Sequence, residues 1–219
     1  MNVDFLSRTM LFRGVIPGEI EEMLGCLGAV SRKFSKGETI CREGDVVEAM
    51  GLVLSGNVQV ENIDLWGNKS ILDTIGPGFV FAETYACIPG EPLMVNVIAV
   101  EPSEVLFLNT ARILETCSNS CPHHNRLIRN LLSISAQKNL KLSRRIFHTS
   151  SKTIRGRVLS YLSYQASFQG SYEFTIPFNR QQLADYLGVD RSALSGELGK
   201  MQKEGLLQVD RNHFRLLEQ

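Results

Sequence analysis

The sequence contains no apolar run approaching the roughly 20 residues that a membrane-spanning helix needs. Its N-terminus, MNVDFLSRTMLFRG, also lacks the basic head and long apolar stretch of a secretory signal peptide. The five cysteines, at positions 26, 41, 87, 117 and 121, are scattered, which argues against structural disulfides in an intracellular chain. Membrane-embedded and disulfide-rich secreted classes are therefore excluded, and the expected location is the cytoplasm.

The chain also has no formal net charge, because its 219 residues include 23 basic and 23 acidic side chains. The balance hides an asymmetry between the two halves. Residues 1–110 hold 7 basic and 15 acidic residues, a charge of −8, and residues 111–219 hold 16 basic and 8 acidic residues, a charge of +8. Such a division indicates a basic, polyanion-binding half joined to an acidic half.

The N-terminal half has the pattern of a β-rich domain. Between residues 29 and 108 the β-branched runs VLSGNVQVENI, KSILDTI, VNVIAV and EVLFL alternate with turn residues. Glycines at positions 37, 44, 51, 56, 67, 76, 78 and 90 are expected where the chain reverses direction. We therefore predict an α+β protein whose residues 1–121 form an antiparallel β-barrel of jelly-roll (double-stranded β-helix) type, with flanking helices.

Residues 122–148 contain no glycine and no proline after Pro122, and their apolar residues return at helical spacing, which predicts one long helix within a segment 122–149. A seam with spacings of 4 and 3 runs along it through Ile128, Leu132, Ser135, Asn139, Leu142 and Ile146. Two interpretations stay open. The seam packs against the barrel, or it forms a homodimer interface in which the polar seam residues set the register.

Residues 150–219 are predicted to form a smaller third unit. A helix over about 152–168 is followed by a strand in YEFTIPF, two helices around Leu187-Gly188-Val189, and a terminal hairpin in LLQVD-RN-HFRLL. The expected order of elements is therefore helix, strand, helix, turn, helix and two strands.

The segment from Asn179 to Met201 has the spacing of the helix-turn-helix itself. Asn179 and Gln182 form a candidate capping box, and Asp190 is a candidate N-cap for the second helix. The buried faces are expected at Leu183, Ala184, Leu187, Leu194, Leu198 and Met201. The candidate DNA-binding residues are two at the start of the first helix and three on the outer face of the second, which enters the major groove: Arg180, Gln181, Arg191, Ser192 and Ser195. Arg180 is placed to meet a phosphate.

These motifs together resemble the cyclic-AMP receptor protein and fumarate–nitrate reductase regulator family, Crp/Fnr, over nearly the whole chain. KGETICREGDVVEAMGLVLSGNVQV resembles its sensor signature, with Gly37, Gly44 and Gly56 at turns and Gly78-Phe79 with Glu83 opening the effector cassette; LADYLGVDRSALSGELGKMQKEGLL resembles its winged helix-turn-helix. The resemblance implies a homodimeric transcription regulator whose partners are a palindromic double-stranded DNA operator, a small-molecule effector and, for an activator, RNA polymerase.

The chain departs from this family's cyclic-AMP-binding members at the effector cassette. The Arg-Ser pair that neutralises the cyclic phosphate in those members corresponds here to Leu93 and Met94. The candidate effector pocket therefore consists of Phe81, Glu83, Leu93, Met94 and, on the long helix, Ser143. We predict that it does not bind cyclic AMP tightly and takes an uncharged aromatic or acyl molecule, or no effector.

A second departure lies in the recognition helix, where Gly196 stands in place of the family's frequent guanine-reading arginine. Arg191 is then expected to carry more of the base discrimination. For the mechanism, we expect that effector binding changes the angle of the chain at about residues 148–152. This change would alter the spacing of the two recognition helices in the dimer.

No metal or cofactor is expected. The scattered cysteines do not suit an iron–sulfur cluster, and in Cys117-x-x-x-Cys121-Pro-His123-His124 the adjacent histidines do not readily share one zinc ion with two cysteines so close in sequence; a redox or metal role for this group stays an open alternative. No phosphate loop or nucleophile–base pair indicates an enzyme. The competing functional class is a ligand-binding or scaffolding module whose helix-turn-helix contacts protein.

Overall fold

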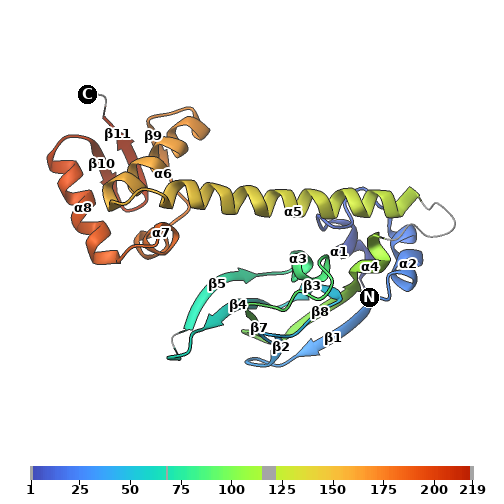
Figure 1. Ribbon diagram of the computed structural model, residues 1–219. Coiled ribbons are helices and arrows are strands. Elements are labelled where there is room, and N and C mark those ends of the chain that lie inside the picture. The colour runs from blue at the N-terminus through green and yellow to red at the C-terminus, as the bar shows by residue number, and fades with distance from the viewer. Residues whose placement is uncertain (1, 68, 115–121, 218–219) are drawn as a thin grey trace. The chain divides into compact units, whose positions relative to one another are not determined.

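The computed structural model describes residues 2–67, 69–114 and 122–217 (Figure 1). The chain divides into two compact units, Met1–Gln137 and Lys138–Gln219, and the division falls within one long helix. The mixed α+β class predicted from the sequence is confirmed, and each unit is described by itself below.

The N-terminal unit alternates short helices with the strands of a barrel. Its helices, together with the long helix that continues into the second unit, are α1 (Val3–Ser7), α2 (Pro17–Cys26), α3 (Glu83–Ala86), α4 (Thr110–Leu114) and α5 (Pro122–Thr149). Its strands are β1 (Val30–Phe34), β2 (Thr39–Cys41), β3 (Ala49–Ser55), β4 (Val58–Ile63), β5 (Lys69–Ile75), β6 (Val80–Phe81), β7 (Asn96–Ala99) and β8 (Ser103–Asn109).

The strands form two antiparallel sheets of four strands, in the orders β1-β8-β3-β6 and β2-β7-β4-β5. One buried apolar cluster draws on both sheets, with Val53, Phe81 and Val105 from the first and Val58 and Val97 from the second. The sheets therefore pack face to face and enclose a core, as the jelly-roll prediction requires.

One glycine expected at a reversal lies elsewhere. Gly51 is inside β3, where it pairs with Phe81 of β6, so the expectation of a turn there was wrong. A Cβ atom on Gly51 would lie 2.2 Å from Cζ of Phe81. This glycine is required for the close approach of an aromatic ring rather than for a turn.

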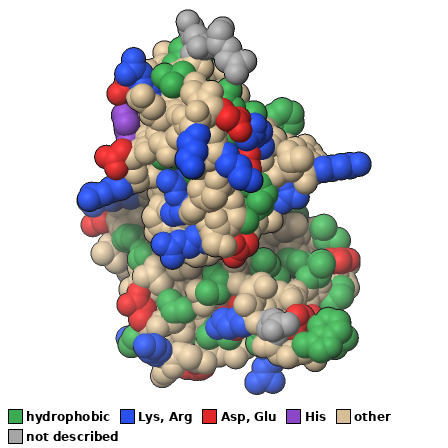
Figure 2. Space-filling model, turned by 90° about the vertical axis from the view of Figure 1, so that its left-hand side faces the viewer, with side chains coloured by type: hydrophobic (Ala, Val, Ile, Leu, Met, Phe, Trp, Pro, Cys, Tyr) green, Lys and Arg blue, Asp and Glu red, His purple; other side chains and the backbone are tan. Residues whose placement is uncertain are grey.

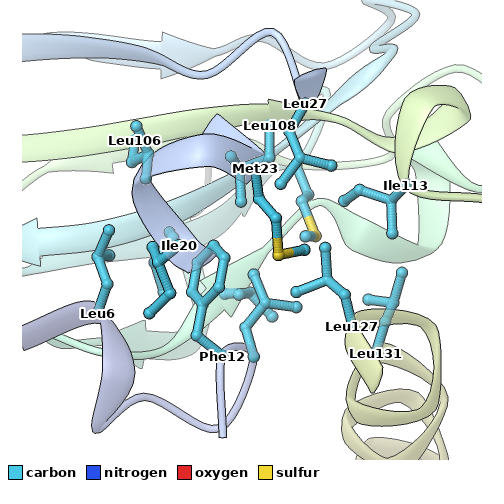
Figure 3. Close-up of a cluster of buried hydrophobic side chains, with 14 of the residues drawn as sticks. Leu6, Phe12, Ile20, Met23, Leu27, Leu106, Leu108, Ile113, Leu127 and Leu131 are labelled. Atoms are coloured by element: carbon cyan, nitrogen blue, oxygen red, sulfur yellow. The ribbon is translucent and has the colours of Figure 1, made fainter. Parts of the chain in front are cut away.

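A second cluster joins the sheet containing β3 and β8 to helices α1, α2, α4 and the beginning of α5. Figure 3 shows Leu127 and Leu131 of α5 pointing into this cluster, toward the side chains of Met23 and Leu27. Asn130 of α5 adds hydrogen bonds to the carbonyls of Leu11, at 2.8 Å, and Arg13, at 2.9 Å. The first turns of α5 are thus part of the N-terminal unit.

The C-terminal unit contains the remaining elements: α6 (Ile154–Gln169), β9 (Glu173–Thr175), α7 (Arg180–Leu187), α8 (Arg191–Lys203), β10 (Leu207–Asp210) and β11 (His213–Leu216). The strands form an antiparallel sheet in the order β10-β11-β9, and the predicted hairpin pairs Leu207 with Leu216 and Asp210 with His213. Among the described helices, none is long and apolar enough to cross a membrane.

Candidate DNA-binding surface and effector site

The helix-turn-helix begins and turns where the sequence predicts. The Asn179 side chain accepts a hydrogen bond from the Gln182 amide, the Gln182 side chain accepts one from the Asn179 amide, and both bonds are 2.9 Å. Gly188 ends α7 with a left-handed backbone at φ 63°. Asp190 then caps α8 by accepting from the Ala193 amide at 2.9 Å. These hydrogen bonds satisfy backbone N–H groups in the first turn of each helix, which have no partner within the helix, and they confirm the predicted caps.

The inner faces of the two helices are buried as predicted. All six apolar positions are at most 2% exposed and belong to one cluster with α6 and the wing strands: Leu183, Ala184, Leu187, Leu194, Leu198 and Met201. Burying this face fixes which face of α8 is left for DNA.

The outer face of α8 exposes Arg191, Ser192 and Ser195. The Ser192 hydroxyl donates to the Asp190 carboxylate, and the Ser195 hydroxyl donates to the Arg191 carbonyl at 2.9 Å. The hydrogen bond from Ser192, followed by one from the Ala193 amide, lowers the pKa of Asp190. Since both serines use their hydrogens within the helix, their oxygens offer acceptor positions outward.

Arg180 is half-buried between the start of α7 and the wing. Its Nη2 donates to the Arg211 carbonyl at 3.4 Å, and its guanidinium lies 6.0 Å from the centre of the Phe214 ring. Its Nη1 is buried without a hydrogen-bond partner among the described residues, and burial lowers the pKa of the side chain. A surface cavity of about 540 Å³ adjoins it, lined also by Pro177, Asn179, Gln182, Arg211 and Asn212.

Gln181, the other residue predicted at the start of α7, is exposed. Its side-chain amide donates to the Asp185 carboxylate one turn along the helix, at 2.8 Å.

Figure 2 shows many separated Lys and Arg side chains, and fewer Asp and Glu, on the face of the C-terminal unit turned to the viewer. This unit thus presents a basic surface to solvent.

The rear of α8 is held by an ion-pair network that the sequence analysis missed. Arg155 of α6 donates to Glu204 at 2.7 and 2.9 Å and to Glu197 at 2.6 Å. These hydrogen bonds raise the pKa of Arg155 and lower that of Glu204. Their effect is to connect α6 to the recognition helix at two points about two helical turns apart.

In the barrel, three of the predicted effector residues are buried and one is not. Phe81, Glu83 and Leu93 are 2%, 3% and 2% exposed, whereas Met94 is 67% exposed. Phe81 and Leu93 belong to the same apolar cluster. The adjacent side chains of Leu93 and Met94 therefore have different environments, and only Leu93 belongs to the barrel core.

The backbone before Glu83 is unusual, because Ala82 adopts a left-handed conformation at φ 58°. Such a conformation favours glycine over residues with a side chain.

Ser143, the fifth predicted effector residue, is exposed in the C-terminal unit, and its hydroxyl donates to the Asn139 side-chain oxygen at 3.5 Å. The barrel also contains an ion pair that the sequence did not predict, between the buried Glu61 and the exposed Lys69.

The helix predicted over residues 122–148 is confirmed as α5, and its apolar residues fall into two groups. Leu127, Leu131 and Ile134 are buried in the N-terminal unit. Of the predicted seam, Ile128 packs partly against that core, whereas three residues are exposed by 60% or more: Leu132, Leu142 and Ile146. Ser135 is partly buried and Asn139 is exposed.

Of the cysteine and histidine group before α5, Cys117 and Cys121 lie outside the described residues, as does the side chain of His123. His124 is 3% exposed. Within the described part of the chain, no three His, Cys, Asp or Glu side chains are grouped to hold a metal ion. Burial, and then the charge of Asp45, raise the pKa of Cys41 to about 11, which makes that thiol unreactive.

Two family models match the chain: the cyclic nucleotide-binding domain over residues 31–120, and the Crp-like helix-turn-helix domain over residues 156–218. The Cyclic AMP receptor protein of Thermus thermophilus is 34% identical over 98 residues, which cover 45% of this chain and 44% of that protein. The Transcriptional activator protein FnrA of Stutzerimonas stutzeri is 26% identical over 195 residues, covering 85% of this chain and 76% of that protein.

The fold agrees with these matches. The crystal structure of the Thermus thermophilus catabolite activator protein superposes with a TM-score of 0.53 at 26% identity, covering 96% of this chain and 94% of that one. The matched domains lie in the order sensor barrel, long helix and winged helix-turn-helix, which is also the order of the structural elements. The chain therefore belongs to the Crp/Fnr family of transcription regulators, whose members bind DNA, dimerise and respond to small molecules.

Proposed function

We propose that this chain binds palindromic operators in the cytoplasm as a homodimer, under the control of a small-molecule effector other than cyclic AMP. The observation that carries the DNA-binding part is the outer face of α8. Arg191, Ser192 and Ser195 are exposed there, on a helix whose opposite face is buried and whose first turn is capped. A recognition helix needs this combination of a fixed orientation and an open face.

The side chains divide by the part of DNA that each suits. Arg191 has the donor geometry for the O6 and N7 acceptors of guanine. Ser192 and Ser195 present acceptor oxygens, which suit the amino groups of adenine or cytosine. Arg180 and Gln181, at the start of α7, suit phosphates, which position the protein without reading sequence.

The exposed apolar residues along α5 support the homodimer. Leu132, Leu142 and Ile146 leave an apolar seam exposed, with Asn139 as a polar position within it. Burial of such a seam against its two-fold copy removes apolar surface from water. A dimer with one recognition helix per chain reads two half-sites about one helical turn, or 34–36 Å, apart. If the protein activates transcription, RNA polymerase is its further partner.

The barrel supports an uncharged effector. The cyclic phosphate would need a cation, and the two cassette positions corresponding to the family's Arg-Ser pair are Leu93, buried among apolar residues, and Met94. Glu83, a buried acidic residue, is nearby in sequence. Burying a phosphate without a cation is unfavourable, so an aromatic or acyl molecule suits this barrel better.

The DNA-binding proposal is tested by a gel shift with fragmented bacterial genomic DNA at stated salt, followed by sequencing of the bound fraction. A regulator should prefer a subset of fragments over random DNA by about a thousandfold or more. Uniform binding, or none, would contradict the proposal and favour a scaffold whose helix-turn-helix contacts protein.

The effector proposal is tested by titrating the full chain with cyclic AMP in a calorimeter, in parallel with native mass spectrometry of the purified protein. We expect no cyclic AMP binding in the micromolar range. A micromolar dissociation constant would refute this part of the proposal and would leave DNA binding untouched.

A further inference from the structure

The C-terminal end of α7 is held by two arginines that lie outside the helix-turn-helix. Arg145 of α5 donates from Nη2 to the Asp185 carbonyl at 2.9 Å and from Nε to the Tyr186 carbonyl at 3.1 Å. Arg157 of α6 donates from Nη1 to the carbonyls of Leu187 and Gly188, both at 3.0 Å. Four consecutive carbonyls at the turn therefore accept hydrogen bonds from guanidinium groups.

This arrangement is favourable for two physical reasons. The last carbonyls of a helix have no partners within the helix and need donors from elsewhere. They also form the negative end of the helix dipole, where positive charge is stabilising. Two arginines at this one end therefore make a strong connection, and the guanidinium of Arg145 lies 5.9 Å from the centre of the Tyr186 ring as well.

The last turn of α5 is itself built into the C-terminal unit. His148, one turn after Arg145, is 1% exposed and lies among aromatic rings, with ring centres 5.5 Å from Tyr161 and 6.1 Å from Tyr186. Its Nδ1 is 3.2 Å from the Ser160 hydroxyl. The end of α5 thus packs against both α6 and α7.

The short segment between α5 and α6 is held from both sides. The Ser150 hydroxyl donates to the Phe147 carbonyl at 2.8 Å, and Arg157 donates from Nε to the Ser151 carbonyl at 2.9 Å. Gly156 lies so close that an added Cβ would be 2.0 Å from the Ser151 hydroxyl oxygen. Arg157 therefore connects this segment directly to the turn between α7 and α8.

We propose that Arg145 and Arg157 are positioning residues for DNA binding. They fix the helix-turn-helix to the end of α5, so that the last turns of α5 and the winged domain orient as one body. Reorientation of the recognition helix then takes place N-terminal to Arg145, within α5, and not at residues 148–152 as the sequence had suggested. This inference rests on the proposed dimeric operator binding.

The test uses the full-length protein and an operator that the wild type selects from random duplexes. Affinities are measured for this operator, for duplexes with one to four base pairs inserted between its half-sites, and for a single half-site. Wild type should lose affinity steeply with each insertion. Arg145→Ala should bind the best operator about tenfold more weakly, with a flatter dependence on insertion, because its recognition helices are less firmly oriented.

The controls separate positioning from folding. Arg144→Ala removes an equal charge from the preceding residue, whose guanidinium lies 5.5 Å from the Tyr164 ring, and should match wild type. Arg145→Lys keeps the charge but has a single donor nitrogen in place of the two that Arg145 uses, and should restore part of the spacing dependence. Affinity for the single half-site should stay within about twofold in all variants, because the reading face of α8 is unchanged.

Two results would overturn the inference. One is a folded Arg145→Ala variant with the spacing dependence of wild type. The other is an equal loss of affinity for the single half-site and the full operator, since that indicates damage to the reading face. A wild-type protein that selects no operator would instead refute the proposed function.

Discussion

An added Cβ atom on Gly51 would occupy the place of the Phe81 ring, 2.2 Å from its Cζ and 2.5 Å from its Cε1. Phe81 is 2% exposed and meets Phe107 edge to face, with the ring centres 6.5 Å apart. The missing side chain of β3 thus makes room for an aromatic ring of the effector cassette.

Gly51→Ala should destabilise the barrel by about 1–3 kcal/mol, because the extra methyl group forces Phe81 or β3 to move. Gly25→Ala is the matched control, since a Cβ there meets nothing within 4 Å on a helix. That control should be neutral or stabilising by up to about 1 kcal/mol. Scanning calorimetry of both variants measures the difference, and equal stabilities would contradict the packing described here.

Two glycines of the C-terminal unit should respond oppositely to alanine. Gly196 of α8 has open space around an added Cβ, so Gly196→Ala should raise stability by up to about 1 kcal/mol. Gly156→Ala should lower it by about 1–3 kcal/mol, since the new Cβ would lie 2.9 Å from the Ser151 Cβ. Thermal unfolding of both variants and of wild type, at one protein concentration, measures the two changes in stability. Changes of the same sign in both variants would contradict this geometry.

Arg191→Ala should weaken specific DNA binding by about 1–3 kcal/mol and relax discrimination at one base pair. The reason is that the arginine can read a guanine directly, whereas phosphate contacts are shared by all sequences. Affinities for the selected operator, its single-base variants and random DNA provide the measurement and its internal control. Equal losses on specific and random DNA would show that Arg191 contacts only phosphate.

The stability of the C-terminal unit should fall in mild acid because of His148. Burial, and then the charge of Arg144, lower the pKa of this imidazole from its ordinary value of 6.5. Below about pH 6.5 the unfolded chain takes up a proton that the folded state resists, so the stability present above that pH is lost as pH falls toward the folded pKa.

The slope attributable to His148 is at most about 1.4 kcal/mol per pH unit, the value for one proton. His148→Phe keeps an aromatic ring in the cluster and removes the titration. Unfolding measured between pH 5 and 8 should therefore show a smaller dependence in this variant. An unchanged dependence would mean that His148 does not contribute.

The exposed seam of α5 predicts the effect of charge on assembly. The double variant Leu142→Glu and Ile146→Glu should sediment as a monomer at concentrations where wild type is a dimer, because two like charges would face their copies across the interface. Phe168→Glu on α6, at a position 73% exposed, is the control and should stay dimeric. If the double variant is still a dimer, the dimer interface does not include this seam.

The amino-acid sequence by itself determined the local elements. Strand runs such as KSILDTI, the glycine-free helix after Pro122, the Asn179–Gln182 box and the turn at Gly188 depend on neighbours within a few residues. Backbone propensity and side-chain spacing act over that range, so each was predicted at its place. The charge division and the motif resemblance led to a DNA-binding regulator in the same way.

The tertiary structure alone decided which distant groups meet. Arg145 and Arg157 bind carbonyls 40 and 31 positions along the chain, and backbone carbonyls have no signature in a sequence. Arg155 and Glu204 are 49 positions apart, and Gly51 shows its purpose only beside Phe81. Such pairs depend on how whole elements pack, because a hydrogen bond or a ring contact requires particular distances that residue types do not specify. How the helix-turn-helix is fastened could therefore be read only from the folded chain.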